Sequence, residues 1–329
     1  MTVKIGMMSF AHLHAHSYAS CVNQLPDAKL VGIADDDMDR ARAMADHFHT
    51  RVFGSYHDLL SSDIEAVIIA SENARHRELT EMAAAAGKHV LSEKPLATTA
   101  ADGLAMISAC RKAGVFLMTA FPCRFSPAMQ RLKAACDAGK IGAIVAIRGT
   151  NRGSNPGGWF NQKKLSGGGA VMDHTVHVTD LMRWLTSSEV ADVYAEIGNG
   201  FYHQDYDDAG FLTMTFENGV FATLDASWSR TKSFPFWGDV TMAVVGEGGV
   251  LTLDMFSQNI VHYSDADMRV YWHNWGSNID LALIGAFVQS VANHTVPPVT
   301  GEDGLRAAEV AFAAYQSAEE GAPVKIKRN

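Results

Sequence analysis

The chain has 329 residues, of which 47% are hydrophobic and 19% are charged, and its formal net charge is −9. This length exceeds the roughly 100 to 200 residues of a typical single domain, so it predicts two domains. The negative charge and the lack of any Lys/Arg run argue against a nucleic acid or an anionic membrane as partner, because both require clustered positive charge.

The sequence also argues against a membrane span and against disulfide or structural zinc sites. It contains no stretch of about 18 apolar residues, and its first ten residues have the pattern of a strand, not of a secretory leader. Four cysteines are present without CxxC spacing. We therefore expect a cytoplasmic protein.

Residues up to about Ala120 alternate short apolar runs with helical patterns. The expected strands are Val3–Met8, Leu30–Ala34, Ala66–Ala70, His89–Leu91 and Phe116–Ala120, and the expected helices are Ala11–Gln24, Met38–Phe48, His76–Ala86 and Ala100–Ala113. Strands this apolar must be covered on both faces, so the pattern predicts a doubly wound α/β domain with a parallel sheet.

After about Ile141 the strands become longer and half polar, with Gly, Asn and Asp turns between them. Expected strands are Ile144–Thr150, Asp192–Gly198, Gly210–Phe216, Val220–Trp228, Val240–Val245 and Gly249–Leu253, and expected helices are Ala170–Thr186, Asp280–Ala292 and Glu302–Ala318. This pattern predicts an α+β domain with an open, mostly antiparallel sheet. We place the cofactor domain at 1–122 and the second domain at 123–329, with the last helix able to pack back on the first domain.

The first strand-to-helix turn is a candidate cofactor site. A dinucleotide site needs small residues there, so that backbone N–H groups can approach a pyrophosphate. Here Ser9, Ala11 and His14 stand where the pattern G-x-G-x-x-G places glycines, and an ordinary turn remains the alternative. We nevertheless assign Ser9, Phe10, Ala11 and His12 to the cofactor.

Asp35 ends the second expected strand, 24 residues after Ala11. An acid at about this spacing binds the adenosine ribose hydroxyls, so it favours NAD over NADP. The alternative is that Asp35, Asp36 and Asp37 only cap the helix that begins near Met38.

Residues 83–96 read AAAAGKHVLSEKPL and resemble the AGKHVLxEKP motif of the glucose-fructose oxidoreductase, inositol dehydrogenase and rhizopine-catabolism protein family (Gfo/Idh/MocA). The resemblance continues in order along the chain. Residues 67–76 are similar to VIIATPNxxH, 120–127 to NRRFxP, 167–177 to GGGxxxDxxxH, and 305–315 to the family's last helix.

This resemblance implies a Rossmann domain, an α+β domain with a large open sheet, a nicotinamide cofactor and sugar or cyclitol substrates. It also implies homodimers or homotetramers that pack through the sheet. It puts Lys94 in the catalytic lysine position and Asp173 and His177 in the pair facing it. The positions it assigns to the cofactor are Asp35, Ser71, Glu72, Asn73, His76, Glu93 and Lys94.

Three departures from the family pattern concern the cofactor and the substrate. The first turn lacks glycines, Glu72 replaces the usual proline, and Pro122 and Cys123 replace polar residues before Arg124. The first departure bears on cofactor binding and the last on substrate identity.

The chemistry suits these residue types. Alcohol oxidation needs a base, and a neutral imidazole at His177 could accept the hydroxyl proton. Asp173 precedes it by one helical turn and could orient it or bind a second hydroxyl. A cation at Lys94 would stabilise the developing alkoxide. The alternatives are a packing histidine and a loop salt bridge.

Arg124, Trp159 and His174 are candidate substrate residues. Arg124 could make a charged contact, the Trp159 ring could stack on a sugar, and His174 lies close to His177 on the same expected helix. Arg124 could equally be structural, and Trp159 could only anchor its loop. We predict no metal site. In a helix from Ala11, the side chains of His12, His14 and His16 would project in steps of about 100° per residue, so neighbouring members of this set would not share a face, although His12 and His16 could.

Two other functions remain open. Bound NAD could act by transient oxidation that enables elimination, glycoside cleavage or epimerisation, without net NADH release. The missing glycines would also suit a noncatalytic nucleotide sensor, although retention of Lys94, Asp173 and His177 together argues against one.

Overall fold

The computed structural model describes residues 2–274 and 276–327, which form two compact units. The first unit combines the residues up to Pro122 with Ile279–Leu305. The second combines Cys123–Asn278 with the residues from Arg306 onward. Each unit is therefore built from two separate stretches of the chain.

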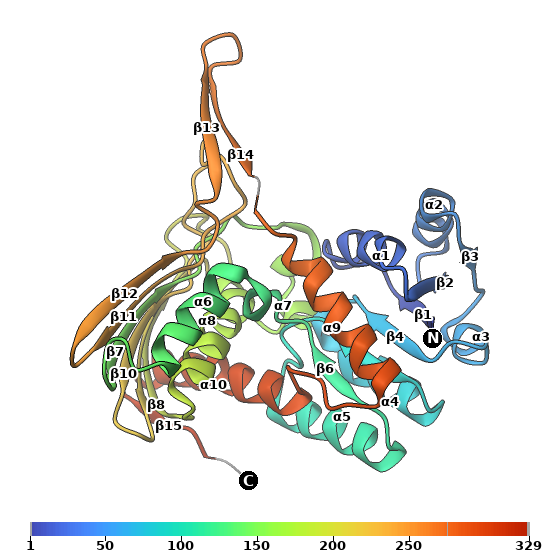
Figure 1. The fold of residues 1–329 in the computed structure, drawn as a ribbon, viewed down its shortest axis with the longest axis horizontal. Helices are drawn as coiled ribbons and strands as arrows, with labels where there is room; N and C mark the ends of the chain where they lie inside the picture. The colour runs from blue at the N-terminus through green and yellow to red at the C-terminus, as the bar shows by residue number, and fades with distance from the viewer. Residues whose placement is uncertain (1, 275, 328–329) are drawn as a thin grey trace. The chain divides into compact units, whose positions relative to one another are not determined.

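The first unit contains a six-stranded parallel sheet in the order β3-β2-β1-β4-β5-β6 (Figure 1). Its strands are β1 Val3–Met8, β2 Ala28–Ala34, β3 Arg51–Val52, β4 Ala66–Ile69, β5 His89–Ser92 and β6 Leu117–Thr119. The strand order reverses at β1 and β4, and ligands of such sheets bind at the carboxyl ends of the strands beside this reversal. The predicted doubly wound fold is confirmed.

Helices cover the sheet of the first unit. They are α1 Ala15–Gln24, α2 Met38–Phe48, α3 Tyr56–Leu60, η1 Asn73–Arg75, α4 His76–Ala85, α5 Ala100–Ala113 and α9 Ile279–Asn293. Local chemistry explains their ends: the side chains of Asp37 and Thr99 accept backbone N–H groups at the starts of α2 and α5, and Gly114 ends α5 in a left-handed conformation. Apolar residues of α3, α4 and α5 form one core with β4 and β5.

The helix α9 joins the first unit although it lies far along the chain. It packs against α1, and Ser17 Oγ donates a hydrogen bond of 2.5 Å to Asp280 Oδ2. Its inward residues are fully buried: Leu283, Ile284, Phe287 and Val288. After α9, Thr300 forms an antiparallel bridge with Met118 of β6.

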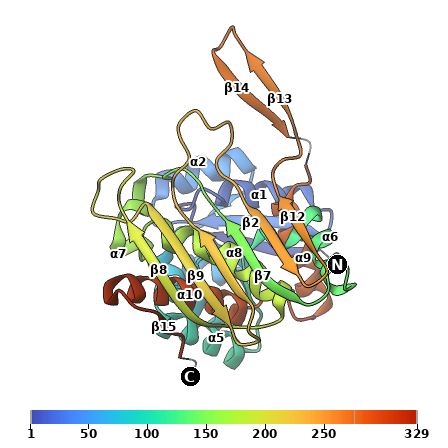
Figure 2. The ribbon, with the colours of Figure 1, turned by 90° about the vertical axis from the view of Figure 1, so that its left-hand side faces the viewer.

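The second unit contains a seven-stranded sheet in the order β12-β11-β7-β10-β9-β8-β15 (Figure 2). Its strands are β7 Ile144–Thr150, β8 Val190–Gly198, β9 Ala209–Phe216, β10 Phe221–Asp225, β11 Thr241–Gly246, β12 Gly249–Asp254 and β15 Val324–Lys325. Only β7 and β10 pair in parallel, so the sheet is mostly antiparallel, as predicted.

One face of this sheet is covered by helices and the other is open. Besides α9, the helical elements from Pro122 onward are η2 Pro122–Phe125, α6 Pro127–Asp137, η3 Gly158–Asn161, α7 Lys163–Ser166, α8 Ala170–Thr186 and α10 Gly301–Glu320. Alternate strand residues such as Leu212, Met214 and Phe216 pack into a core with α8 and α10. In Figure 2 the opposite face is turned to the viewer, without a covering helix.

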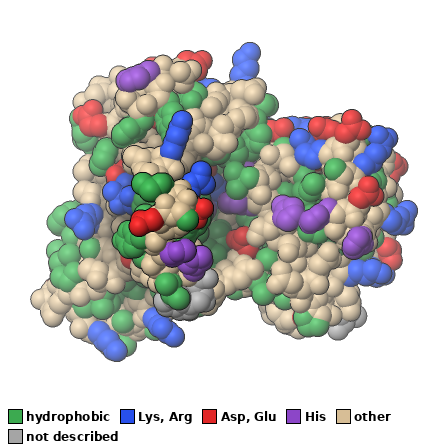
Figure 3. Space-filling model, turned by 90° about the horizontal axis from the view of Figure 1, so that it is seen from above, with side chains coloured by type: hydrophobic (Ala, Val, Ile, Leu, Met, Phe, Trp, Pro, Cys, Tyr) green, Lys and Arg blue, Asp and Glu red, His purple; other side chains and the backbone are tan. Residues whose placement is uncertain are grey.

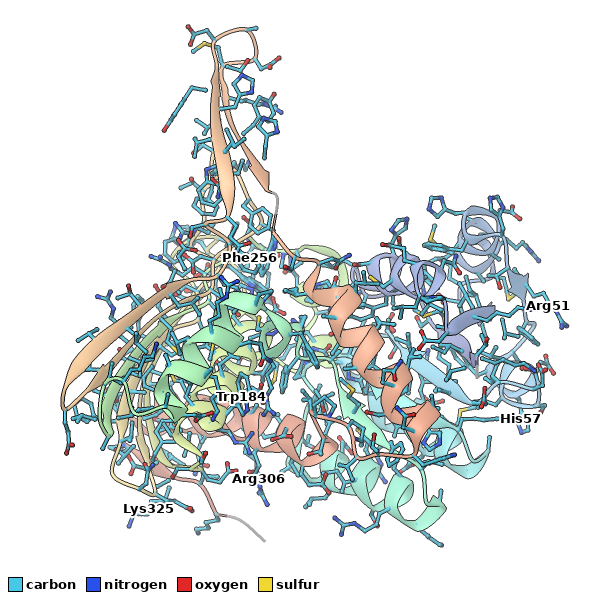
Figure 4. The ribbon with its side chains drawn as sticks, viewed as in Figure 1. Arg51, His57, Trp184, Phe256, Arg306 and Lys325 are labelled. Atoms are coloured by element: carbon cyan, nitrogen blue, oxygen red, sulfur yellow. The ribbon has the colours of Figure 1, made fainter. Side chains whose placement is uncertain are left out.

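A β-hairpin that the sequence analysis did not predict extends from the second unit (Figure 1). It consists of β13 Asn259–Ser264 and β14 Arg269–Asn274. At its base the Phe256 ring packs against Phe236 and Trp237, with centroid distances of 5.2 and 5.4 Å (Figure 4). This aromatic contact joins the segment that leads into β13 to the segment that leads into β11.

Across the residues that the structure describes, no helix is both long enough and apolar enough to cross a bilayer.

Candidate active site

The first turn of the Rossmann unit keeps the backbone shape of a glycine turn without the glycines. Ser9 has φ 71°, in the left-handed region that glycine adopts most readily. Its hydroxyl accepts the Ala11 N–H at 3.1 Å and so stabilises the turn locally. At the N-cap of α1, the His14 side chain makes no capping hydrogen bond, and the His14 backbone N–H donates to His12 Nδ1 at 3.1 Å. Cofactor binding by this turn stays a prediction.

Asp35 is nearly buried at the end of β2 and is already held by protein donors. Its carboxylate accepts the Phe10 N–H at 2.6 Å and the Asp37 N–H at 3.0 Å. Arg40 donates to both oxygens, from Nε at 2.9 Å and from Nη2 at 2.6 Å. Four donors match the acceptor capacity of a carboxylate, so a ribose hydroxyl has to compete with Arg40 for Asp35.

Ser71, Asn73 and His76 follow β4 and are all buried. His76 Nδ1 lies 2.9 Å from the Pro95 carbonyl oxygen, which can only accept, so Nδ1 carries the proton. Burial lowers the pKa of His76, which favours the neutral ring at pH 7. His76 therefore holds the chain directly after Lys94, in addition to its predicted place beside the cofactor.

Lys94 follows β5 and is 4% exposed. Glu93, just before it, is fully buried, and its Oε1 accepts hydrogen bonds from Tyr18 Oη at 2.5 Å and His14 Nδ1 at 2.8 Å. Its Oε2 accepts the backbone N–H of Lys94 at 2.6 Å. The predicted catalytic lysine is thus at the carboxyl edge of the sheet, beside a fixed carboxylate.

His12, His14 and Glu93 converge, with one potential metal ligand atom from each within 4.8 Å of the others. The sequence argument against a shared face was wrong for His12 and His14, because α1 begins at Ala15 and both residues lie in the turn before it. Their positions could hold a divalent cation, although Glu93 Oε1 already accepts two hydrogen bonds. His16 instead lies 3.1 Å from His47, ring nitrogen to ring nitrogen, where histidines gather over α1 and α2 in Figure 3.

In the second unit, the turn before α8 needs glycines, because neighbouring groups pack too closely against its backbone to leave room for a side chain. A Cβ on Gly169 would lie 2.0 Å from the Asp207 carbonyl oxygen, and one on Gly168 would lie 2.1 Å from Tyr315 Oη. Asp207 accepts the N–H groups of Gly169 and Val171, both at 2.8 Å, and Tyr315 donates to it. Asp207 and Tyr315 therefore fix the start of the helix that carries the candidate site. The sequence analysis assigned neither residue a role.

Asp173, His174 and His177 lie on α8, each less than 8% exposed. The Trp228 indole N–H donates to Asp173 Oδ2 at 3.1 Å, and His174 Nε2 lies 3.2 Å from the same oxygen. A Cβ on Gly153 would lie 2.5 Å from the His174 ring, so this glycine lets its loop pass beside His174. Trp228 is a residue of the site that sequence reasoning missed.

Trp159 lies in η3, where its ring stacks on Phe160 with centroids 4.0 Å apart. Phe160 belongs to a small core with Ala170 and Trp228, so Trp159 packs beside the residues that surround Asp173. This position is compatible with both interpretations from the sequence, a sugar-stacking ring and a loop anchor.

Arg124 forms a buried, bidentate salt bridge with Asp180 of α8. Its Nε and Nη2 lie 2.7 and 2.6 Å from the two carboxylate oxygens. The guanidinium also lies 5.7 Å from the centre of the Trp184 ring, which Figure 4 labels. This geometry supports the structural role of Arg124 that the sequence left open beside substrate binding.

The candidate residues thus form two sets. The first unit carries Lys94 and the cofactor residues, and the second carries Asp173, His174 and His177. A model of the oxidoreductase family with an NAD-binding Rossmann fold matches residues 3–121, and a GFO/IDH/MocA C-terminal domain model matches residues 129–252. The chain belongs to the Gfo/Idh/MocA oxidoreductase family.

Full-length relatives agree with this assignment. The uncharacterized oxidoreductase YrbE of Bacillus subtilis is 30% identical and covers 98% of this chain and 95% of its own. Myo-inositol 2-dehydrogenase of Thermotoga maritima is 28% identical, with coverage of 98% and 97%. The solved structure of GenD2 from gentamicin A biosynthesis, in complex with NAD, has a TM-score of 0.91 at 23% identity, over 99% of this chain and 97% of its own. At that identity the last similarity shows the fold alone.

Within the Gfo/Idh/MocA family this chain is an NAD-dependent oxidoreductase, and the expected family resemblance is confirmed. The roles of the individual site residues stay predictions.

Proposed function

We propose that this oxidoreductase transfers a hydride between NAD and a secondary hydroxyl or keto carbon of a sugar, cyclitol or related polyol. The observation that carries the proposal is the buried Lys94 at the carboxyl edge of the parallel sheet, held by Glu93 before it and by His76 after it. The similarity to a myo-inositol 2-dehydrogenase supports this substrate class. We place the reaction in the cytoplasm.

The proposed roles follow from the chemistry of each group. When bound, NAD+ supplies the hydride acceptor. His177 accepts the hydroxyl proton as general base, and the Lys94 ammonium stabilises the negative charge that develops on the oxygen. Asp173, oriented by the Trp228 indole, binds a neighbouring hydroxyl or orients an imidazole. Trp159 and His174 remain proposed substrate contacts, and we assign Arg124 a structural role through its salt bridge with Asp180.

The test is calorimetry with NAD+ and NADP+, followed by NADH absorbance with a panel of cyclitols, aldoses and sugar acids that includes myo-inositol. Dinucleotide binding with turnover supports the proposal. No binding of either dinucleotide would contradict it and favour a different role for the altered first turn. Product formation without stoichiometric NADH would instead show transient oxidation by bound NAD.

We propose NAD+ as the preferred cofactor, because the carboxylates of Asp35 and Asp36 oppose a 2′-phosphate. Replacing Asp35 with asparagine is expected to raise the dissociation constant for NAD+ by about 10-fold or more, since hydrogen bonds to a charged group are lost. The dissociation constant for NADP+, divided by that for NAD+, should fall, because Arg40 is released from its salt bridge with Asp35. Calorimetry measures both. Asp39→Asn, on the exposed surface of α2, is the matched control.

Unchanged NAD+ affinity in Asp35→Asn would contradict the ribose role and leave Asp35 as a helix-start residue.

We also propose that a second copy of this chain covers the open face of the seven-stranded sheet. Phe211, Phe221 and Val250 lie on that face and are 58%, 55% and 57% exposed. Phe221→Asp should therefore shift the mass measured by light scattering from a dimer or tetramer to a smaller species. Phe201→Asp, at a 54% exposed site in a loop, should leave it unchanged. A monomeric wild type would refute this interface.

A further inference from the structure

Glu93 is a fully buried carboxylate to which the proposed chemistry assigns no step. Three donors surround it. Tyr18 Oη donates at 2.5 Å and His14 Nδ1 at 2.8 Å to Oε1, while the Lys94 backbone N–H donates at 2.6 Å to Oε2. One carboxylate therefore links the start of α1 to the peptide that carries the candidate catalytic lysine.

The residues around Glu93 shift one another's pKa values so that Glu93 stays charged. Burial alone would raise the pKa of Glu93, but His12, His14 and Lys94 outweigh burial and hold that pKa well below its usual range. Burial opposes charge on His14 as well, yet Glu93 raises the pKa of His14 above its usual value. Burial and Glu93 both raise the pKa of Tyr18, so its phenol keeps the proton that it donates. Glu93 is thus an anion between proton donors.

The backbone around Lys94 is held on both sides. Before it, Glu93 Oε2 accepts the Lys94 N–H, and after it, His76 Nδ1 donates to the Pro95 carbonyl at 2.9 Å. The second contact comes from His76, at the same carboxyl edge of the sheet as Lys94. The first depends on the orientation of the Glu93 side chain, which His14 and Tyr18 determine through Oε1.

The departure of the first turn from the glycine pattern explains where these donors come from. His14 stands at the third glycine position, and a glycine there would offer no side-chain donor. Tyr18 follows four residues later on α1, and its backbone N–H bonds the His14 carbonyl at 3.0 Å. Residues four apart on a helix lie on one face, so the two side chains reach the same carboxylate oxygen.

We propose that His14 and Tyr18 are positioning residues for catalysis: they fix the Glu93 carboxylate, and through it the backbone and the electrostatic surroundings of Lys94. This inference rests on the proposed function of Lys94. Neither residue needs to touch the substrate. Their loss should therefore slow the chemical step more than it weakens binding of substrate or NAD+.

The experiment compares His14→Ala, His14→Asn and Tyr18→Phe with the wild type and with His16→Ala, an exposed residue of the same helix start. The probes are NAD+ and myo-inositol, or the compound of the panel that the wild type oxidises fastest. We expect kcat to fall by about 10- to 100-fold in His14→Ala and about 10-fold in Tyr18→Phe. KM and the dissociation constant for NAD+ should change by less than about threefold. His14→Asn, whose amide can replace the Nδ1–H donor, should recover most of kcat.

Several outcomes would overturn the inference. One is an unchanged kcat in both His14→Ala and Tyr18→Phe while Lys94→Ala remains inactive, which leaves the proposed function intact. Another is a fall in kcat that His14→Asn does not rescue. A third is a stoichiometric metal ion in the purified protein that His14→Ala loses, since Glu93 would then serve a cation. Full activity in Lys94→Ala would refute the proposed function itself. Thermal melting identifies any variant that fails to fold. If His14→Ala does not fold, Tyr18→Phe, which removes only one oxygen atom, still tests the inference.

Discussion

Replacing Lys94 with alanine should lower kcat for alcohol oxidation by about 10²- to 10⁴-fold, the range that a positioned proton-transfer or charge-stabilising group contributes. Lys94 is 4% exposed at the end of β5, its backbone N–H donates to Glu93, and the carbonyl of the next residue, Pro95, accepts a hydrogen bond from His76. Steady-state NADH absorbance gives kcat, and calorimetry gives the NAD+ dissociation constant, which should change far less.

Lys112→Ala is the matched control, because Lys112 lies on the exposed surface of α5 in the same unit. Its kcat should equal that of the wild type. Loss of NAD+ binding in Lys94→Ala, in parallel with the loss of turnover, would show that the lysine acts in cofactor binding and not in the chemical step.

Replacing Arg124 with leucine should lower the free energy of unfolding by about 3 to 5 kcal/mol, because it leaves the Asp180 carboxylate buried without its bidentate partner. Arg183 Nη1, 3.8 Å from Asp180 Oδ1, compensates only in part. Urea denaturation followed by tryptophan fluorescence measures the change, since Trp184 lies beside the guanidinium.

The double variant Arg124→Leu, Asp180→Leu separates the two roles of Arg124. Removing both charges should restore most of the stability, since no buried carboxylate remains alone. If Arg124→Leu leaves the urea midpoint unchanged and raises KM for the sugar, Arg124 is a substrate residue, and its salt bridge contributes little to the fold.

The regular elements of both sheets could be predicted because their periods and end signals are local. Asp37 and Thr99 begin helices through their own side chains, and Gly114 ends one. The short strand β3 and the hairpin β13–β14 were missed, although residues 259–274 carry β-branched and aromatic residues on both sides of a polar turn. The helix α6, which begins with Pro127 in its first turn, was missed as well.

Contacts between distant residues could not be predicted from one sequence. Arg124 and Asp180 are 56 positions apart, and Tyr18 and Glu93 are 75 apart. No local pattern pairs them. The error over His12 and His14 had a local cause. The sequence analysis began the helix at Ala11, four residues too early, and so treated two residues of the turn as helical. Motif resemblance predicted Lys94, Asp173 and His177 as site residues, but the groups that hold Lys94 and Asp173 became visible only in three dimensions.

The insertion of α9 into the first unit affects how the protein is made. During synthesis, residues 1–122 leave the ribosome long before Ile279–Leu305, so α1 and β1 lack the helix that packs against them. The nascent Rossmann unit therefore exposes the apolar surface that Leu283, Phe287 and Val288 later bury. The intervening residues of the second unit are synthesised before the first unit can be completed. A fragment that ends at Pro122 would carry the same exposed surface and would make a poor isolated NAD-binding module.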